Sequence, residues 1–149
     1  MTTNLASIVD AKNIFILQNN DISKKQILEN IAQTIADNAD INFKTILSAL
    51  LNREKMGSTV IGHGVALPHG RVEGLSAPQL VIIRLEKPIF FDPNNEEAVD
   101  IIIGLCVPID ATDAHLQILS SIAKKLSDVN IRNELRKAKS AEAIYKLFL

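Results

Sequence analysis

Val99–Val107 is the segment that most restricts the fold, because it is almost continuously apolar and is closed by Pro108. Only Asp100 and Gly104 interrupt it. A strand with one solvated face alternates apolar and polar residues, whereas a strand covered on both faces reads as an unbroken apolar run. The segment therefore predicts a central strand of a sheet that is packed on both sides.

Segments with helical periodicity alternate with short apolar runs along the rest of the chain. Ser23 can cap a helix that runs to about Ala39, and Asn42 can cap a helix that delivers Arg53 and stops at Gly57. Further helices are expected from Thr112 or Asp113 through Ser127, after a cap at Asn130, and after a cap at Ser140. Strands are expected at 13–17, 58–61, 65–67 and 79–85, and turn chemistry at 90–95.

This alternation predicts an α/β fold with a mixed β-sheet flanked by helices on both sides. The sheet is expected to be mixed because the strand pieces within 58–67 are close enough to pair antiparallel. The chain has 149 residues, 47% of them hydrophobic, with no repeat and no linker-like stretch. We therefore expect one domain over residues 1–149.

Composition argues against several classes of protein. A net charge of −1 and an aromatic content of 4% do not favour a nucleic-acid partner. The single cysteine, Cys106, allows no disulfide within the chain and lies in an apolar run, which is typical of a buried side chain in a reducing compartment. No secretory signal and no membrane-spanning run are visible, so we expect a cytoplasmic protein without membrane insertion.

The stretch Arg53–Gly70 is the candidate site. It holds four of the six glycines and two of the three histidines, His63 and His69. Glycines gather where a backbone turns sharply or approaches another group closely, and histidine exchanges groups near neutral pH. Pro68 favours an extended conformation before it, so His69 is expected at the end of a stiff extended segment.

Common cofactor motifs do not fit this stretch. Gly62-His63-Gly64 lacks the third glycine of a dinucleotide fingerprint, because position 67 is leucine. The spacings of His63, His69 and His115 match no common zinc pattern, and no phosphate-binding loop or serine-nucleophile elbow is present. We therefore expect neither a metal nor an organic cofactor.

His69 is a candidate covalent nucleophile, since a neutral imidazole can accept a phosphoryl group near pH 7. One ring nitrogen attacks while an acceptor holds the other. The phosphorylated ring carries about two negative charges, which a guanidinium and hydrogen-bond donors stabilise. Arg53, at a helix end, and His115, in a first helical turn, are the candidates for these roles. The structural alternative is that His69 only occupies a turn.

The same residues resemble a known active-site signature. Arg53-Glu-Lys-Met-Gly-Ser-Thr-x-Ile-Gly-x-Gly-Val-Ala-Leu-Pro-His-Gly is similar to that of the enzyme IIA components of the phosphoenolpyruvate-dependent phosphotransferase system, in the fructose/mannitol class. Ile89-x-Phe91-Asp92, Val99-Asp100 and Val107-Pro108 match the middle of that family. The stretch from His115 to Leu126 matches its second histidine helix.

The resemblance implies a role for each matching residue. His69 would receive phosphate on Nε2 from a phosphorylated HPr/NPr-type carrier, Arg53 would contact the phosphoryl group, and His115 would assist without being phosphorylated. The implied fold is a mixed five-stranded sheet with helices on both sides, and no metal or organic cofactor takes part. His63 occupies a position that varies in the family, so an exposed loop histidine without a catalytic role is expected.

Within the family, the sequence is most similar to the nitrogen-regulatory (PtsN-type) IIA proteins. These are phosphoryl carriers that regulate target proteins according to their phosphorylation state. The alternative is a sugar-specific IIA, for fructose or mannitol, that passes phosphate to a cysteine of a IIB domain during sugar uptake. A non-catalytic binding module is disfavoured because Arg53, His69 and His115 are all present.

Overall fold

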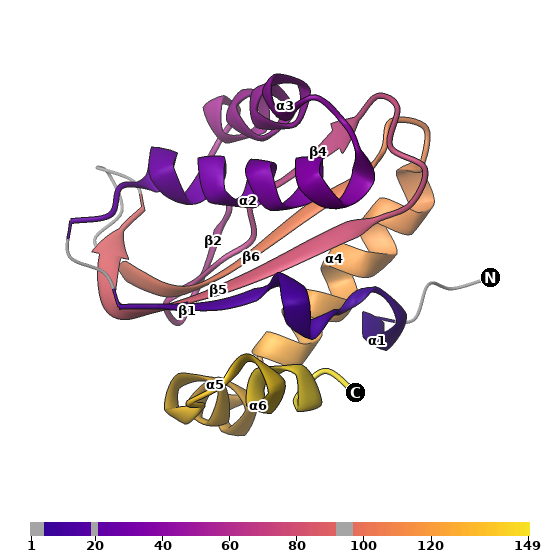
Figure 1. Ribbon diagram of the computed structural model, residues 1–149. Coiled ribbons are helices and arrows are strands. Elements are labelled where there is room, and N and C mark those ends of the chain that lie inside the picture. Colours follow the sequence, from indigo (N-terminus) through magenta and orange to yellow (C-terminus); the bar gives the residue numbers. More distant parts are fainter. Residues whose placement is uncertain (1–4, 19–20, 92–96) are drawn as a thin grey trace.

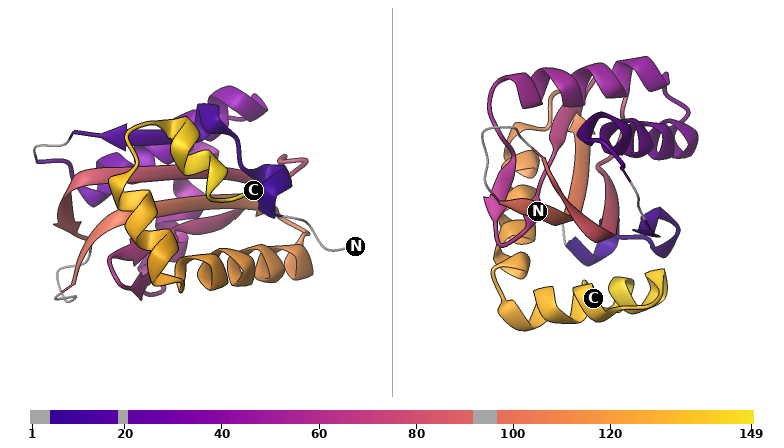
Figure 2. Two further views of the ribbon diagram at one scale, coloured as in Figure 1. Left: turned by 90° about the horizontal axis from the view of Figure 1, so that it is seen from below. Right: turned by 90° about the vertical axis from the view of Figure 1, so that its left-hand side faces the viewer.

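The computed structural model describes residues 5–18, 21–91 and 97–149. A single mixed sheet lies between two layers of helices, as Figures 1 and 2 show. The helical elements are α1 (Leu5–Ile8), η1 (Ala11–Asn13), α2 (Lys24–Ala39), α3 (Phe43–Lys55), α4 (Thr112–Leu126), α5 (Val129–Lys137) and α6 (Ala141–Lys146). The strands are β1 (Ile14–Leu17), β2 (Val60–Gly62), β3 (Val65–Ala66), β4 (His69–Val72), β5 (Gln79–Phe90) and β6 (Ala98–Pro108).

The sheet has the strand order β1-β5-β6-β3-β2, and β4 also pairs with β6. β1 runs parallel to β5, and both β3 and β4 run parallel to β6, whereas β2–β3 and β5–β6 are antiparallel. The mixed sheet and the antiparallel pairing within 58–67 are therefore confirmed. Within the described residues the sheet has six strands, close to the five that the resemblance implies, and β3 and β4 occupy successive stretches of the same edge of β6.

β6 is the central strand that the sequence predicts. Ile102 and Cys106 pack with α2 and α3 on one face, while Ile101, Ile103 and Leu105 pack with α1, α4, α5 and α6 on the other. All five side chains have no exposed surface. Figure 2 shows the two helical layers on opposite sides of the sheet. The almost continuously apolar sequence thus reflects burial of both faces.

Side-chain caps begin three of the helices where the sequence predicts. Ser23, Asn42 and Ser140 accept hydrogen bonds from the backbone of α2, α3 and α6, respectively. The cap expected at Asn130 is wrong. Asp128 caps α5 instead, accepting from the backbone N–H of Asn130 at 2.8 Å, so the helix begins two residues earlier.

β5 is longer than predicted. The sequence places its end near Leu85, before Lys87-Pro88, but the strand continues to Phe90. Its register against β6 shifts between Arg84 and Ile89. Proline cannot donate to a strand ladder, and an irregular stretch of this kind accommodates it. Most of the turn expected at 90–95 lies outside the described residues.

Two glycines let the upper helices approach the sheet. A Cβ on Gly104 of β6 would lie 2.7 Å from the side chain of Ile31 in α2. A Cβ on Gly70 of β4 would lie 3.2 Å from the backbone of Ala49 in α3. Gly70 directly follows His69, and Arg53 lies one helical turn after Ala49. The close contact of α3 with β4 therefore brings Arg53 near the start of β4, where His69 lies.

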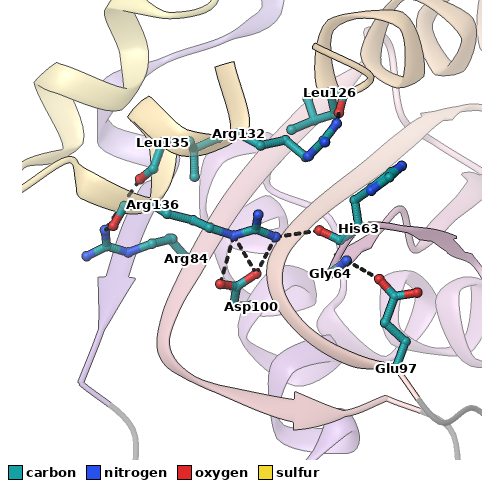
Figure 3. Close-up of polar contacts among 9 residues, drawn as sticks. All are labelled: His63, Gly64, Arg84, Glu97, Asp100, Leu126, Arg132, Leu135 and Arg136. Atoms are coloured by element: carbon teal, nitrogen blue, oxygen red, sulfur yellow. Dashed lines mark hydrogen bonds and ion pairs between the residues drawn. The ribbon is translucent and has the colours of Figure 1, made fainter. Parts of the chain in front are cut away.

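Two buried arginines fix the C-terminal helices beneath the sheet (Figure 3). Arg84 of β5 donates through Nη1 to the carbonyls of Leu135, Arg136 and Ala138 at the end of α5. Arg132 donates to the carbonyl of Leu126 at the end of α4, over 2.8 Å. The last carbonyls of a helix have no partner within the helix, and a cation placed there also meets the negative end of the helix dipole.

Replacing Arg84 by methionine is expected to lower the free energy of unfolding by about 3 kcal/mol, because three buried or half-buried carbonyls lose a charged donor. Chemical denaturation measures the change. Lys25→Met on the exposed side of α2 is the matched control and should shift stability by less than about 0.5 kcal/mol. Equal stability of the Arg84 variant and the wild type would contradict this role of Arg84 as a helix cap.

Candidate active site

His69 begins β4 and is half-buried. Its Nδ1 lies 2.7 Å from the carbonyl oxygen of Leu67. A carbonyl only accepts, so Nδ1 carries the proton and donates, which leaves the lone pair of the neutral ring on Nε2. Burial is the main cause that lowers the pKa of His69; the bond to Leu67 opposes it and the charge of Arg53 adds to it. The ring is therefore a neutral nucleophile with its free nitrogen fixed as Nε2.

His115 lies beside His69, as the sequence predicts. The two ring centroids are 5.1 Å apart and the rings meet edge to face at 83°. His115 is buried, with 7% of its surface exposed. Burial lowers its pKa to about 4, assisted by the nearby His69 and by the positive charges of Arg71 and Arg53. At neutral pH His115 is therefore an uncharged imidazole that can donate one hydrogen bond and accept another.

Arg53 lies in the last turn of α3 and is part of the same group. Its positive charge lowers the pKa of both His69 and His115. Its Nη1 donates to the carbonyl of Gly57 over 3.0 Å, which holds the chain just beyond the helix. Gly57 itself has a φ of +149°, in agreement with its predicted place at the helix stop. The structure thus brings together all three residues that the sequence selects.

Arg71 also contacts the site, although the sequence analysis did not select it. Its Nε donates to Nδ1 of His115 over 3.5 Å. It stands two residues after His69 on the same strand, so both side chains point to the same face of the sheet. That spacing was the one available signal, but it does not reveal that His115 lies next to Arg71.

Glu54 and Thr59 form a supporting layer that sequence reasoning also missed. The hydroxyl of Thr59 donates to Oε1 of Glu54, and Nζ of Lys24 lies 2.9 Å from the other carboxylate oxygen. The carbonyl of Thr59 accepts from the backbone N–H of Leu67 over 2.9 Å. Because the carbonyl of Leu67 holds His69, this chain of contacts fixes the acceptor on which the His69 tautomer depends. Both residues stand within Arg53–Gly70, but only the fold links them to Leu67.

His63 lies away from this chemistry. It is exposed in the turn between β2 and β3 and has a φ of +56°. Its carbonyl accepts a hydrogen bond from Arg136 of α5, whose guanidinium also forms an ion pair with Asp100 at 2.9 Å (Figure 3). The expectation that His63 is an exposed loop residue is therefore confirmed, and its contacts serve the packing of the hairpin on α5.

The arrangement suits the binding of an anion at Nε2 of His69. The charge of Arg53 acts on the imidazole of His69, and the neutral imidazole of His115 at its side is influenced by both Arg53 and Arg71. Positive charge and oriented donors of this kind stabilise a transferring phosphoryl group. Within the described residues, no three His, Cys, Asp or Glu side chains are grouped to hold a metal ion.

Cys106 takes no part in this chemistry. It has no exposed surface, and burial raises the pKa of its thiol to about 12. The predicted buried role is thus confirmed. Among the described helices, none is both long and apolar enough to cross a bilayer.

Comparisons with known proteins agree with this fold. The family model described as "Phosphoenolpyruvate-dependent sugar phosphotransferase system, EIIA 2" matches residues 7–149. A nitrogen regulatory protein of Klebsiella oxytoca is 42% identical over 126 residues, which cover 84% of this chain and 78% of that protein. Another from Pseudomonas aeruginosa is 40% identical over the same length and covers 84% and 82%.

Solved structures lead to the same family. The nitrogen regulatory protein IIA-Ntr of Neisseria meningitidis superposes with a TM-score of 0.89 and 32% identity, over 99% of this chain and all of that one. IIA mannitol of Escherichia coli, at 22% identity and a TM-score of 0.79 over 95% and 99% of the two chains, shares the fold. The chain belongs to the EIIA type 2 family of the phosphoenolpyruvate-dependent sugar phosphotransferase system, and its homologues include the nitrogen regulatory IIA proteins.

Proposed function

We propose that His69 is the residue that accepts and donates the phosphoryl group, and that the chain acts as a phosphoryl-carrying regulator of the nitrogen-regulatory type. The observation that carries the proposal is the bond from Nδ1 of His69 to the carbonyl of Leu67. It leaves Nε2 as the nucleophilic nitrogen, beside Arg53 and His115. The identity of about 40% to nitrogen regulatory proteins supports the regulatory role.

The proposed step exchanges one phosphorus–nitrogen bond for another. The lone pair on Nε2 of His69 attacks the phosphorus of a phosphohistidine on an HPr/NPr-type carrier. The bond from that phosphorus to the carrier's ring breaks, and the electron pair returns to the carrier's imidazole. His69 keeps its proton on Nδ1 throughout, so no proton has to move. Such a balanced exchange needs positioning and charge stabilisation rather than a cofactor.

Phosphorylation at His69 would change how the surface meets its partners. A phosphoryl group adds about two negative charges next to Arg53 and Arg71. The positive charge around His69 is then neutralised or reversed, which alters complementarity for a partner protein. This electrostatic switch is the proposed means by which target proteins distinguish the two states. We propose that the exchange takes place in the cytoplasm.

The test is to incubate the protein with phosphoenolpyruvate, enzyme I and an HPr-type carrier, and to measure its intact mass. We expect a gain of one phosphoryl group that is lost in acid, as a phosphohistidine requires, and no gain when the carrier is omitted. Trypsin cuts after Lys55 and Arg71, so His63 and His69 fall in one peptide and His115 in another. Fragment ions then locate the phosphate. An unmodified protein, or phosphate on His63 or His115, would overturn the proposal.

A second measurement separates regulation from sugar transport. Adding a fructose or mannitol IIB domain tests for onward transfer to its cysteine. We expect the phosphoryl group to stay on the chain, with partner binding that differs between the two states. Rapid transfer to such a IIB domain would instead identify the chain as a sugar-specific IIA.

A further inference from the structure

Arg71 and His115 are joined by a contact to which the proposed step assigns no role. Nε of Arg71 donates to Nδ1 of His115 over 3.5 Å. Arg71 is exposed on β4, whereas His115 is buried on α4, 44 residues further along the chain. The two meet because Arg71 is in register with Val107 of β6, and the chain leaves β6 at Pro108 to enter α4.

The contact decides where His115 carries its proton. Arginine is always protonated and has no acceptor, so its Nε–H can only donate. Nδ1 of His115 must then present its lone pair, and the single proton of the neutral ring must be on Nε2. The positive charge of Arg71 acts in the same direction, because it opposes a proton on the nitrogen next to it.

We propose that Arg71 is a positioning residue that holds His115 in the Nε2–H tautomer, so that Nε2–H donates a hydrogen bond to the phosphoryl group on His69. The inference rests on the proposed function in so far as it requires the phosphoryl group to be on His69. The tautomer itself is a property of the resting protein. His115 would thus be a fixed donor, unable to compete with His69 as nucleophile, because its Nε2 has no free lone pair.

The surroundings of His115 keep the ring neutral, as a fixed tautomer requires. His69 meets it edge to face, and Arg71 and Arg53 add positive charge, while Asp113 is the acidic residue of the first turn of α4. Burial and the three neighbouring groups together hold the pKa of His115 near 4. Protonation would place a further positive charge beside two guanidinium groups, so the neutral donor persists across the physiological range.

Arg53 offers a contrast that makes the assignment testable. Its charge also lowers the pKa of His115, but its Nη1 donates to Gly57. If only positive charge mattered, removing either arginine would change the tautomer. If the contact at Nδ1 matters, only removal of Arg71 will change it.

The experiment reads the ring nitrogens of His115 by long-range ¹H–¹⁵N correlation at pH 7 in wild type, Arg71→Met, Arg71→Lys and Arg53→Met. In the wild type we expect a protonated Nε2 and an unprotonated Nδ1. Arg71→Met should give a mixture of tautomers and raise the pKa of His115 above about 4, because a positive charge is lost. Arg71→Lys should restore the pure tautomer, and Arg53→Met should leave it unchanged. A wild type with the proton on Nδ1, or a pure Nε2–H tautomer in Arg71→Met, would overturn the proposal.

The rate of phosphoryl acceptance provides the functional readout. If the two tautomers of His115 become about equally populated, the fraction of molecules with the proton on Nε2 falls about twofold. The freed ring can also rotate away from His69. We therefore expect Arg71→Met to accept phosphate about three- to tenfold more slowly. Thermal unfolding should be unchanged, because Arg71 is exposed. An unaltered acceptance rate would remove Arg71 from the mechanism. A wild type that takes no phosphate would overturn the proposed function instead, while the tautomer in the resting protein still tests the contact of Arg71.

Discussion

Replacing His69 with glutamine is expected to abolish phosphoryl acceptance. Glutamine can fill the half-buried position and donate to the carbonyl of Leu67, but it offers no nucleophilic nitrogen in place of Nε2. The loss should be complete within the detection limit of intact mass spectrometry, because His115 carries its proton on the nitrogen that would have to attack. The measurement uses phosphoenolpyruvate, enzyme I and an HPr-type carrier in excess.

His63→Gln is the matched control for this variant. His63 lies only six residues away, and its side chain is exposed in the β2–β3 turn, so this variant should take up phosphate at the wild-type rate. The backbone contact of residue 63 with Arg136 does not depend on the side chain, so this variant retains it. Phosphorylation of the His69 variant at His115 would show that the second histidine is an acceptor and would contradict the fixed tautomer. Loss of acceptance in the His63 variant would contradict the separation of the two histidines.

The helices and strands were predictable from sequence where their own residues were enough to specify them. The run from Val99 to Val107 required burial on both faces whatever its neighbours, and the side chains of Ser23 and Asn42 cap helices through contacts within three residues. Local chemistry of this kind is readable from sequence because the partners are adjacent in the chain.

The wrong predictions, for the start of α5 and the end of β5, arise where the local sequence allows more than one boundary. Ser127-Asp128-Val129-Asn130 offers both Asp128 and Asn130 as caps for α5. Asp128 is the cap, and the helix that it begins places Arg132 so that its guanidinium donates to the carbonyl of Leu126 at the end of α4. β5 passes Pro88 because its long pairing with β6 resumes at Ile89 and Phe90 after the register shift. Both outcomes depend on contacts with other elements.

In the candidate site, too, some features were predictable from the sequence and others depend on contacts that only the fold creates. Arg53, His69 and His115 were selected through their chemistry and through the family resemblance, and the structure brings them together. The acceptor that sets the tautomer of His69 was not predictable, because it is a main-chain carbonyl that any residue at position 67 supplies. Arg71 was missed since its partner lies 44 residues away, and that proximity exists only once β4 pairs with β6.

Replacing Arg53 with alanine is expected to slow phosphoryl transfer by about 10²–10³-fold, the cost of removing one preorganised charged donor from a transition state. Arg53→Lys should be intermediate, because an ammonium retains the charge but lacks the planar pair of donors that matches phosphate oxygens. Single-turnover transfer from the phosphorylated carrier, followed by intact mass, gives the rates. Thermal unfolding verifies that each variant is folded.

Lys55→Ala is the matched control for Arg53, since Lys55 carries the same charge in the same last turn of α3 and is exposed. An equal loss of rate in both variants would show that only the overall positive field of the helix end matters. An unchanged rate in Arg53→Ala would remove Arg53 from the site.

The titration of His69 provides a second, independent test of where Arg53 acts. The charge of Arg53 helps to lower the pKa of His69, so Arg53→Ala should raise that pKa while Lys55→Ala leaves it unchanged. The direction of this shift matters for the mechanism.

A higher pKa of His69 leaves more of its ring protonated at a given pH, and a protonated imidazole has no lone pair with which to attack. Arg53 would therefore act twice, first by keeping Nε2 of His69 free of a proton, and then by stabilising the phosphoryl group that Nε2 receives. If Arg53 acts only by lowering the pKa of His69, raising the pH should restore the transfer rate of Arg53→Ala. If Arg53 also stabilises the phosphoryl group, the rate of Arg53→Ala should stay below that of the wild type at every pH. A rate that recovered fully at high pH would rule out direct stabilisation of the phosphoryl group by Arg53.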